Sequence, residues 1–218
     1  MDKKQLLFAS QNENKVKEVR ALLQGKYEVV SLNDIQFKGE LAEPFDTFSE
    51  NAKIKAKQGY ELFGHPCFSE DAGLVAEALH GRPGVKSARY AGEHKNPTDN
   101  VKKVLGEMQG IDHRSAYFIA VIAYYDGTEY QLFEGRVYGT LEHESRGTHG
   151  FGYDPIFKPL GYDQTFGELD DSIKAKMSHR AKAMGLFLEW MYGIPILLSP
   201  EVIWINSLKQ GPNHNLSI

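Results

Sequence analysis

The stretch that decides the fold is FSEDAGL, residues 68–74, which follows HPC at 65–67 and places two carboxylates side by side before a glycine. Adjacent carboxylates repel, and each raises the other's proton affinity unless a cation or solvent screens the charge. One interpretation is a solvated turn, because Glu and Asp beside Gly are common where a strand ends. The other is a divalent-metal site at the carboxyl end of a strand, where open α/β sheets place their ligands.

On either side of this stretch, strand-like and helix-like patterns alternate. The spacing of Val16, Val19, Leu22 and Leu23 predicts a helix from Lys15 that stops at Gly25. A second helix is expected to open at the capping-box pattern TFSE and to run to about residue 62. Short strands are expected at residues 5–10, 27–32 and 66–68.

The second half of the chain contains a long hairpin. Residues 115–125 are rich in Ile, Val, Tyr and Phe, Asp126-Gly127 is a hairpin signal, and residues 128–140 return as a second strand. A helix is expected from Thr98, with Gly110 behind its end, and another over residues 179–191. These patterns predict an α/β protein with a mixed sheet and an antiparallel ribbon. We expect a single domain of one or two lobes over residues 1–192 and a tail of unknown role over 193–218.

Bulk properties restrict the class of protein. A net charge of -4 argues against a sequence-independent grip on nucleic acid, which needs a basic surface. No apolar run approaches the roughly 20 residues that span a bilayer, and the amino terminus has no export signal. The single cysteine, Cys67, excludes an internal disulfide and fits a reducing compartment. The expectation is a cytoplasmic protein with no membrane or nucleic-acid partner.

Polar clusters lie at the ends of four expected elements. SQNENK at 10–15 is either an ordinary helix start or a phosphate cradle at a helix amino terminus. Glu43 precedes the second helix, and Glu50 and Lys53 lie near its start with the spacing of a surface ion pair. Sequence motifs for P-loop, Rossmann, zincin and serine-hydrolase sites are missing from the chain.

The other two clusters lie late in the chain. GFGYDPIF at 150–157 is either a glycine-rich turn with core aromatics or a stacking surface for a nucleobase. Lys174 with SHR at 178–180 could bind phosphate or a base carbonyl, although a histidine in that place is more often a capping or packing residue. Together, the four clusters describe a nucleotide site in which the carboxylates hold magnesium.

These residues resemble the inosine triphosphate pyrophosphatase family, also called XTP/dITP diphosphatases. The resemblance spans residues 5 to about 190 and consists of six stretches in the family's order. They are SQNENK at 10–15, TFSENAKIKA at 47–56, SEDAGL at 69–74, GRPGVKSARYAG at 81–92, GFGYDPIF at 150–157 and KAKMSHRAKA at 174–183. The resemblance implies an elongated mixed sheet with flanking helices, a homodimer, and Mg²⁺-dependent hydrolysis of ITP, dITP and XTP to the monophosphate and pyrophosphate.

The resemblance also implies roles for residues. Asp71 would be the proton acceptor and a magnesium ligand, and Glu43 the other ligand, with Glu70 as the alternative. The substrate-binding set would be Ser10, Gln11, Asn12, Glu13, Asn14, Lys15, Lys53, Ala72, Phe151, Gly152, Tyr153, Asp154, Lys174, His179 and Arg180. Two other hypotheses are a related pyrophosphatase that prefers modified pyrimidines and a nucleotide sensor without turnover. GFGYDP with SHR argues against the first, and retention of a general base argues against the second.

Overall fold

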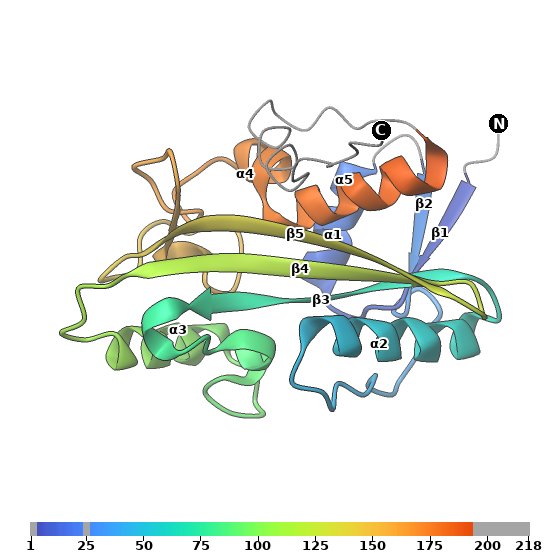
Figure 1. The fold of residues 1–218 in the computed structure, drawn as a ribbon, viewed down its shortest axis with the longest axis horizontal. Coiled ribbons are helices and arrows are strands. Elements are labelled where there is room, and N and C mark those ends of the chain that lie inside the picture. The colour runs from blue at the N-terminus through green and yellow to red at the C-terminus, as the bar shows by residue number, and fades with distance from the viewer. Residues whose placement is uncertain (1–3, 24–26, 194–218) are drawn as a thin grey trace, which may run out of the picture.

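The computed structural model describes residues 4–23 and 27–193, whose strands form one six-stranded sheet in the order β2-β1-β3-β4-β5-β6 (Figure 1). The strands are β1 (Lys4–Phe8), β2 (Tyr27–Ser31), β3 (Cys67–Ala76), β4 (Ser115–Tyr125), β5 (Tyr130–Leu141) and β6 (Phe157–Pro159). The α-helices are α1 (Glu13–Leu22), α2 (Phe48–Phe63), α3 (Pro97–Glu107), α4 (Asp171–Met177) and α5 (His179–Tyr192). The 3-10 helices are η1 (Glu77–Leu79), η2 (Gly84–Arg89) and η3 (Asp154–Ile156).

Strands β1, β2 and β3 run parallel to one another, and β4, β5 and β6 continue the sheet in antiparallel pairs. The predicted mixed, elongated sheet is therefore confirmed. The predicted hairpin is also confirmed, because β4 and β5 pair along their whole length from Ser115↔Thr140 to Tyr125↔Tyr130. Asp126 stabilises the turn by accepting hydrogen bonds from the backbone N–H groups of Thr128 and Glu129, each at 2.8 Å.

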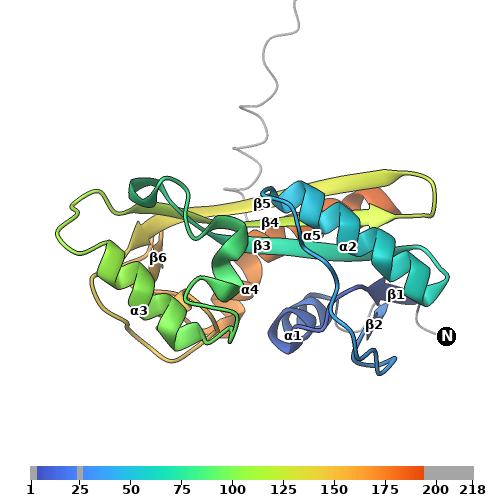
Figure 2. The same cartoon turned by 90° about the horizontal axis from the view of Figure 1, so that it is seen from below.

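Helices α2 and α5 pack on opposite faces of the long strands (Figures 1 and 2). Because successive strand residues point to opposite faces, odd-numbered residues of β4 meet α2 and even-numbered ones meet α5. On the α2 face, Ile119 and Val121 pack against Ala52 and Ala56. On the α5 face, Ala120 and Ile122 lie in one cluster with Ala183, Met184 and Phe187.

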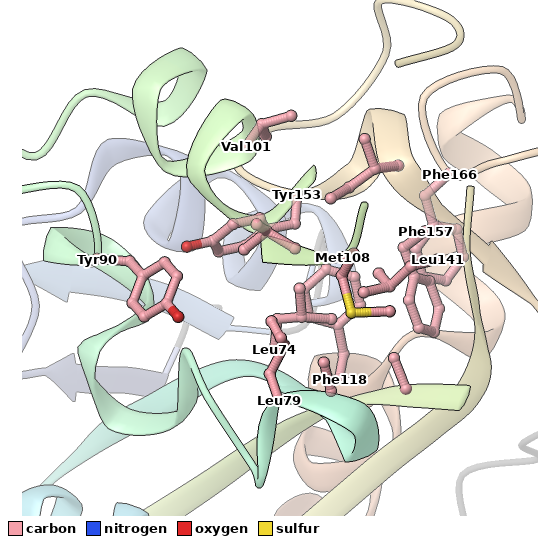
Figure 3. Close-up of a cluster of buried hydrophobic side chains, with 14 of the residues drawn as sticks. Leu74, Leu79, Tyr90, Val101, Met108, Phe118, Leu141, Tyr153, Phe157 and Phe166 are labelled. Atoms are coloured by element: carbon pink, nitrogen blue, oxygen red, sulfur yellow. The ribbon is translucent and has the colours of Figure 1, made fainter. Parts of the chain in front are cut away.

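A second core lies at the other end of the sheet (Figure 3). Here Leu74 of β3 and Phe118 of β4 meet Val101 and Met108 of the α3 region and Phe157 of β6. All five side chains are less than 10% exposed, and the aromatic ring of Phe118 lies 4.7 Å from that of Phe157. This cluster fixes the segments around η2 and η3 against the long strands.

The helix boundaries follow from local capping. Thr47 accepts a hydrogen bond from the Glu50 backbone N–H at 3.2 Å and donates to the Glu50 carboxylate at 2.6 Å, which confirms the predicted capping box. Asn12 caps α1, so this helix begins two residues before the predicted Lys15. Gly64 and Gly193 end α2 and α5 in the left-handed region, at φ values of 69° and 63°, which glycine adopts without steric cost.

The strand that carries FSEDAGL differs from the prediction. A strand was expected over 66–68 only, whereas β3 extends over ten residues, and Glu70 and Asp71 lie in its interior. The stretch is therefore neither a turn nor the carboxyl end of its own strand. Strand β1 pairs with β3 only at Phe8↔Phe68, so residues beyond 68 face the segment that leaves β1. The site consequently opens beside the carboxyl end of β1.

No helix in the described part of the chain is long and apolar enough to cross a membrane. Of the predicted tail, only Gly193 belongs to the described residues, where it caps α5. The expectation for residues 194–218 falls outside them.

Candidate active site

The two adjacent carboxylates of β3 point to opposite faces of the sheet. Glu70 pairs with Ile122 in the strand register and meets Arg180 of α5, whereas Asp71 pairs with Val121 and meets Lys55 of α2. Each carboxylate therefore has its own cation from the helix on its own face. This separation, rather than one shared metal ion, is how the structure relieves the repulsion expected from the sequence.

On the α5 face, Arg180 holds Glu70 in a two-bond ion pair. Its Nε and Nη2 donate to the two oxygens of Glu70 at 2.6 and 2.7 Å, and both side chains are essentially buried. Lys15 Nζ lies 3.4 Å from Glu70 Oε1. Burial opposes ionisation of Glu70, but Arg180 and then Lys15 hold the pKa of this carboxyl far below its usual range. Glu70 is thus a permanently charged anchor for Arg180.

Glu18 of α1 and Asp154 extend this ion-pair network. Glu18 contacts Arg180 Nη1 and accepts from Lys174 Nζ at 2.8 Å, and Asp154 accepts from the same Nζ at 2.6 Å. Burial would raise the pKa of Glu18, yet Arg180 and Lys174 lower it on balance. Burial prevails at Asp154 and raises the pKa of its carboxyl above the ordinary value. The network fixes the cations of α4 and α5 in place.

The GFGYDP loop places an aromatic ring over these cations. Lys174 Nζ and the Arg180 guanidinium lie 4.9 and 5.7 Å from the centre of the Phe151 ring. Asp154 holds the loop by accepting from the Phe151 backbone N–H at 2.7 Å. Gly150 is required there, because its φ is 71° and a Cβ would lie 2.1 Å from Asp154 Oδ2. The half-buried Phe151 ring therefore has a fixed orientation at the cavity.

His179 forms part of the wall between α5 and β4. Its ring stacks on Phe118 with centroids 4.9 Å apart, and it is 6% exposed. Burial and then the neighbouring Arg180 lower the pKa of His179 well below its ordinary value, so the imidazole is neutral at physiological pH. Its Nδ1 atom has no hydrogen-bond partner among the described residues. This nitrogen can accept or donate a hydrogen bond, depending on the tautomer.

On the α2 face, Lys55 lies between two carboxylates. Its Nζ donates to Glu43 Oε1 at 2.5 Å, to Asp71 Oδ1 at 3.0 Å and to the Glu70 carbonyl at 2.9 Å. Burial alone would lower the pKa of Lys55, but Asp71 and Glu43 raise it. The second Asp71 oxygen, Oδ2, is buried and has no hydrogen-bond partner in the part of the chain that the structure describes. An unpaired buried carboxylate oxygen is costly, which suggests that it contacts water, metal or substrate.

Both faces border one cavity of about 1100 Å³ that is large enough for a nucleotide. Its described lining contains seven Lys or Arg and six Asp or Glu residues, whereas the chain as a whole has a net charge of -4. The cavity is therefore less negative than the rest of the molecule. A ligand with several negative charges and an aromatic part matches this arrangement.

A family model described as the Ham1 family matches residues 6–190. The chain belongs to the Ham1 family. It is 42% identical over 187 residues to the dITP/XTP pyrophosphatase of Porphyromonas gingivalis, covering 85% of this chain and 96% of that protein. It is 45% identical over 185 residues to the enzyme of the same name from Bacillus licheniformis, covering 83% and 94%.

Solved structures of the Ham1 family have the same fold. The Ham1 protein of Staphylococcus aureus superposes with a TM-score of 0.79 at 32% identity, covering 87% of this chain and 99% of that one. A Ham1 protein from Coxiella burnetii gives the same TM-score at 33% identity, covering 88% and 100%. The family predicted from the six sequence stretches is confirmed.

Most of the residues that the sequence singled out lie together around the Ham1-family cavity. Those that line it are Ser10, Gln11, Asn12, Asn14, Lys15, Glu43, Asp71, Ala72, Phe151, Gly152, Tyr153, Asp154, Lys174, His179 and Arg180. Glu13 is not among the lining residues, and its carboxylate contacts Asn33 instead. Lys53 is also absent from the lining, and its Nζ lies 5.9 Å from the centre of the Tyr130 ring.

Three residues of the site were missed from the sequence. Lys55 occupies the place expected of Lys53, and helical spacing could have identified it, because Ala52, Lys55 and Ala56 share the buried face of α2. Glu18 follows Lys15 by three residues on α1, which indicates a shared face. Arg89 of η2 has its Nη1 atom 3.4 Å from Glu43 Oε2, and no local sequence pattern predicts that contact.

Proposed function

We propose that this chain hydrolyses non-standard purine nucleoside triphosphates, ITP, dITP and XTP, to the monophosphate and pyrophosphate. The observation that carries the proposal is the division of one cavity into two chemically different ends. A rigid aromatic and cationic wall is built on α5, and a carboxylate with a spare oxygen lies on the α2 side of β3. Names of Ham1-family relatives agree with this assignment.

The α5 end suits a purine base with a carbonyl at C6. Phe151 offers a ring for stacking, which is worth about 1–3 kcal/mol per base. Three of the five N–H donors of Arg180 contact carboxylate oxygens, which leaves two for a ligand within the described site. Such donors can bind the C6 carbonyl of hypoxanthine or xanthine but not the amino group of adenine. Guanine shares the carbonyl and must be excluded through its C2 amino group.

The α2 end suits the hydrolytic step. Asp71 acts as general base and takes a proton from water at its free oxygen. The water oxygen forms a bond to the α-phosphorus, the bond from that phosphorus to the bridging oxygen breaks, and pyrophosphate leaves with the electron pair. Lys55 and Lys15 stabilise the negative charge that builds up on the phosphate oxygens.

The donor set fits Mg²⁺, which prefers one or two carboxylates together with phosphate oxygens and water. Asp71 offers an oxygen without a partner, and Glu43 is about one-third exposed to the cavity. Both carboxylates contact cations, Glu43 with Lys55 and Arg89 and Glu70 with Arg180 and Lys15. The Glu70 side chain is fully buried, whereas that of Glu43 is 31% exposed, so Glu43 is our choice of second ligand. No group of three His, Cys, Asp or Glu side chains converges among the described residues, so substrate oxygens and water would have to complete the coordination. Bound Mg²⁺ would neutralise charge on the triphosphate.

A panel of nucleoside triphosphates, assayed by phosphate release with added inorganic pyrophosphatase, tests the proposal. ITP and XTP should react fastest, GTP far more slowly, and ATP and the pyrimidine triphosphates slowest, because a site that binds a carbonyl rejects substrates lacking it. Arg180→Ala should narrow the gap between ITP and ATP, and Phe151→Ala should slow all purine substrates. Equal hydrolysis of ATP and ITP by the wild type would refute the base assignment, and preference for modified pyrimidines would favour the alternative enzyme.

Metal dependence needs a separate measurement. Turnover should stop in EDTA and return with Mg²⁺, whereas Ca²⁺ should support it poorly because Ca²⁺ is larger and less rigidly coordinated. Activity that persists in chelator would remove Glu43 and Asp71 from the metal site. Dimerisation and a cytoplasmic location remain predictions, and light scattering during gel filtration would measure the first.

A further inference from the structure

The amino-terminal turn of α5 rests directly on the backbone of β5 at Gly135. A Cβ atom at this position would lie 2.2 Å from the carbonyl oxygen of His179, 2.5 Å from the backbone nitrogen of Ala183 and 2.9 Å from Lys182 Cβ. Ordinary van der Waals contact begins at about 3.4 Å. Two of these three atoms belong to the helix backbone, so rotation of a side chain would not make room.

The residue opposite Gly135 is also small. Gly135 pairs with Ala120 of β4, which is fully buried and packs with Ala183 of α5. Together, Gly135 and Ala120 let the first turn of α5 approach the sheet as closely as backbone packing allows. Any larger group at Gly135 has to lift that turn from the sheet.

The lifted turn would carry two residues of the cavity. His179 contributes the carbonyl oxygen in the contact, and its ring stacks on Phe118 of β4. Arg180 follows it and makes two bonds to Glu70 of β3 at 2.6 and 2.7 Å. Phe118 and Glu70 are on the sheet, while His179 and Arg180 themselves are on the helix. The distance between α5 and β5 therefore determines how these side chains enter the cavity.

We propose that Gly135 is a positioning residue for substrate selectivity. Because Gly135 has no side chain, the first turn of α5 can lie close to the sheet. This distance holds His179 and Arg180 in the geometry that distinguishes the base. The inference rests on the proposed function, in which Arg180 binds the base, and His179 lines the same cavity. Gly135 does not itself touch the cavity, since it is absent from the described lining.

Gly139 provides a matched control in the same strand. It is buried on the same face, and a Cβ there would lie 2.2 Å from the Lys158 carbonyl oxygen and 2.8 Å from Phe157 Cζ. The contact is as tight as that of Gly135, but it is made to β6 and not to α5. Gly139→Ala should therefore destabilise the protein to a similar extent and leave Arg180 in place, because its contacts reach α5 indirectly, from Phe157 through Phe118 to His179.

The experiment compares kcat/KM for ITP and ATP in wild type, Gly135→Ala and Gly139→Ala. Misplacement by about 1 Å costs up to about 100-fold in well-oriented sites, so the ITP-to-ATP ratio of Gly135→Ala should fall by about tenfold or more. The ratio of Gly139→Ala should stay at the wild-type value. An unchanged ratio in Gly135→Ala, or an equal fall in both variants, would overturn the inference.

The second variant, Ala183→Ser, adds one oxygen atom to a fully buried side chain in the same cluster as Ala120, between α5 and the sheet, and is used if Gly135→Ala does not fold. Its ratio should fall in the same direction by a smaller factor, and an unchanged ratio would overturn the inference. A wild type without preference for ITP would instead reject the proposed function. The experiment therefore distinguishes a failure of the inference about Gly135 from a failure of the proposed function.

Discussion

Glu70 and Asp71 are neighbours in sequence, but they lie in two regions with different properties. On the α5 face, Glu70 contacts Arg180 and Lys15, and Glu18 and Asp154 complete a network in which carboxylates and cations have mutual partners. On the α2 face, Asp71 keeps one buried oxygen without a partner among the described residues. A network whose carboxylates are all paired with cations holds its shape, whereas a carboxylate with a free oxygen can bind a ligand or take a proton.

The difference follows from the pleat of a single strand. Side chains of consecutive residues point to opposite faces, so one strand delivers one carboxylate to each side of the sheet. Each helix then supplies a cation, Arg180 from α5 and Lys55 from α2. In the proposed function, base recognition on one face of β3 and hydrolysis on the other are therefore separated by the thickness of one strand and share one cavity.

The largest expected effect comes from a substitution in the ion-pair network around Glu70 on the α5 face. Glu70→Gln removes the charge that compensates Arg180, and breaking a buried ion pair typically costs about 3–5 kcal/mol. We expect a loss of about 3 kcal/mol in the free energy of unfolding, at the low end of that range because Glu18 still contacts Arg180. Urea unfolding measures it. A loss no larger than that of a surface substitution would contradict the network.

The pH dependence of stability sharpens the same test. The folded-state pKa of Glu70 lies below its ordinary value of 4.5, so its ionisation stabilises the fold above pH 4.5. That contribution is lost progressively as the pH falls below 4.5, because the unfolded chain then binds the proton first. The difference in stability between wild type and Glu70→Gln should be largest near neutral pH and should narrow in acid. A constant difference across this range would contradict the assignment.

The next largest effect is expected from a substitution of Asp71 on the α2 face. Asp71→Asn keeps the shape of the side chain but removes the proton acceptor, and turnover should fall at least about 100-fold, the usual scale of general-base catalysis. Stability should change less than in Glu70→Gln, because only one Asp71 oxygen is paired among the described residues and the amide oxygen can still accept from Lys55. Pyrophosphate release gives the rate, and thermal melting gives the control. Near-normal turnover would mean that Asp71 is not the base.

The sequence predicted most of the fold because its signals were local. The capping box at Thr47, the Asp126-Gly127 turn and the alternation of helices and strands each reflect a few neighbouring residues. The interior of β3 was misinterpreted for the same reason. Polar residues next to glycine resemble a turn, and only the cations on α2 and α5 make them acceptable inside a strand. Those partners are distant in sequence, so local pattern did not reveal them.

Where a motif contains only one residue of the required type, the sequence placed that residue at the cavity. Where a motif contains two such residues, the sequence did not distinguish them. The stretch NAKIKA contains Lys53 and Lys55, and only the orientation of α2 distinguishes them. Lys55 lies on the buried face with Ala52 and Ala56, whereas Lys53 points toward Tyr130 near the hairpin. A two-residue shift along a helix turns a side chain to a different face, so a match of motif alone did not identify the residue.

The smallest expected effect compares these two lysines. Lys55→Met removes charge-assisted hydrogen bonds, each typically worth about 1.5–3 kcal/mol, and should lower kcat/KM for ITP more than about tenfold. Lys53→Met removes a cation outside the cavity and should change stability by less than about 0.5 kcal/mol and kcat/KM by less than about twofold. Both substitutions delete one positive charge from the same helix, so any general electrostatic effect is shared. A loss of activity in Lys53→Met as large as in Lys55→Met would show that the phosphates extend past the α2 wall of the cavity toward the hairpin.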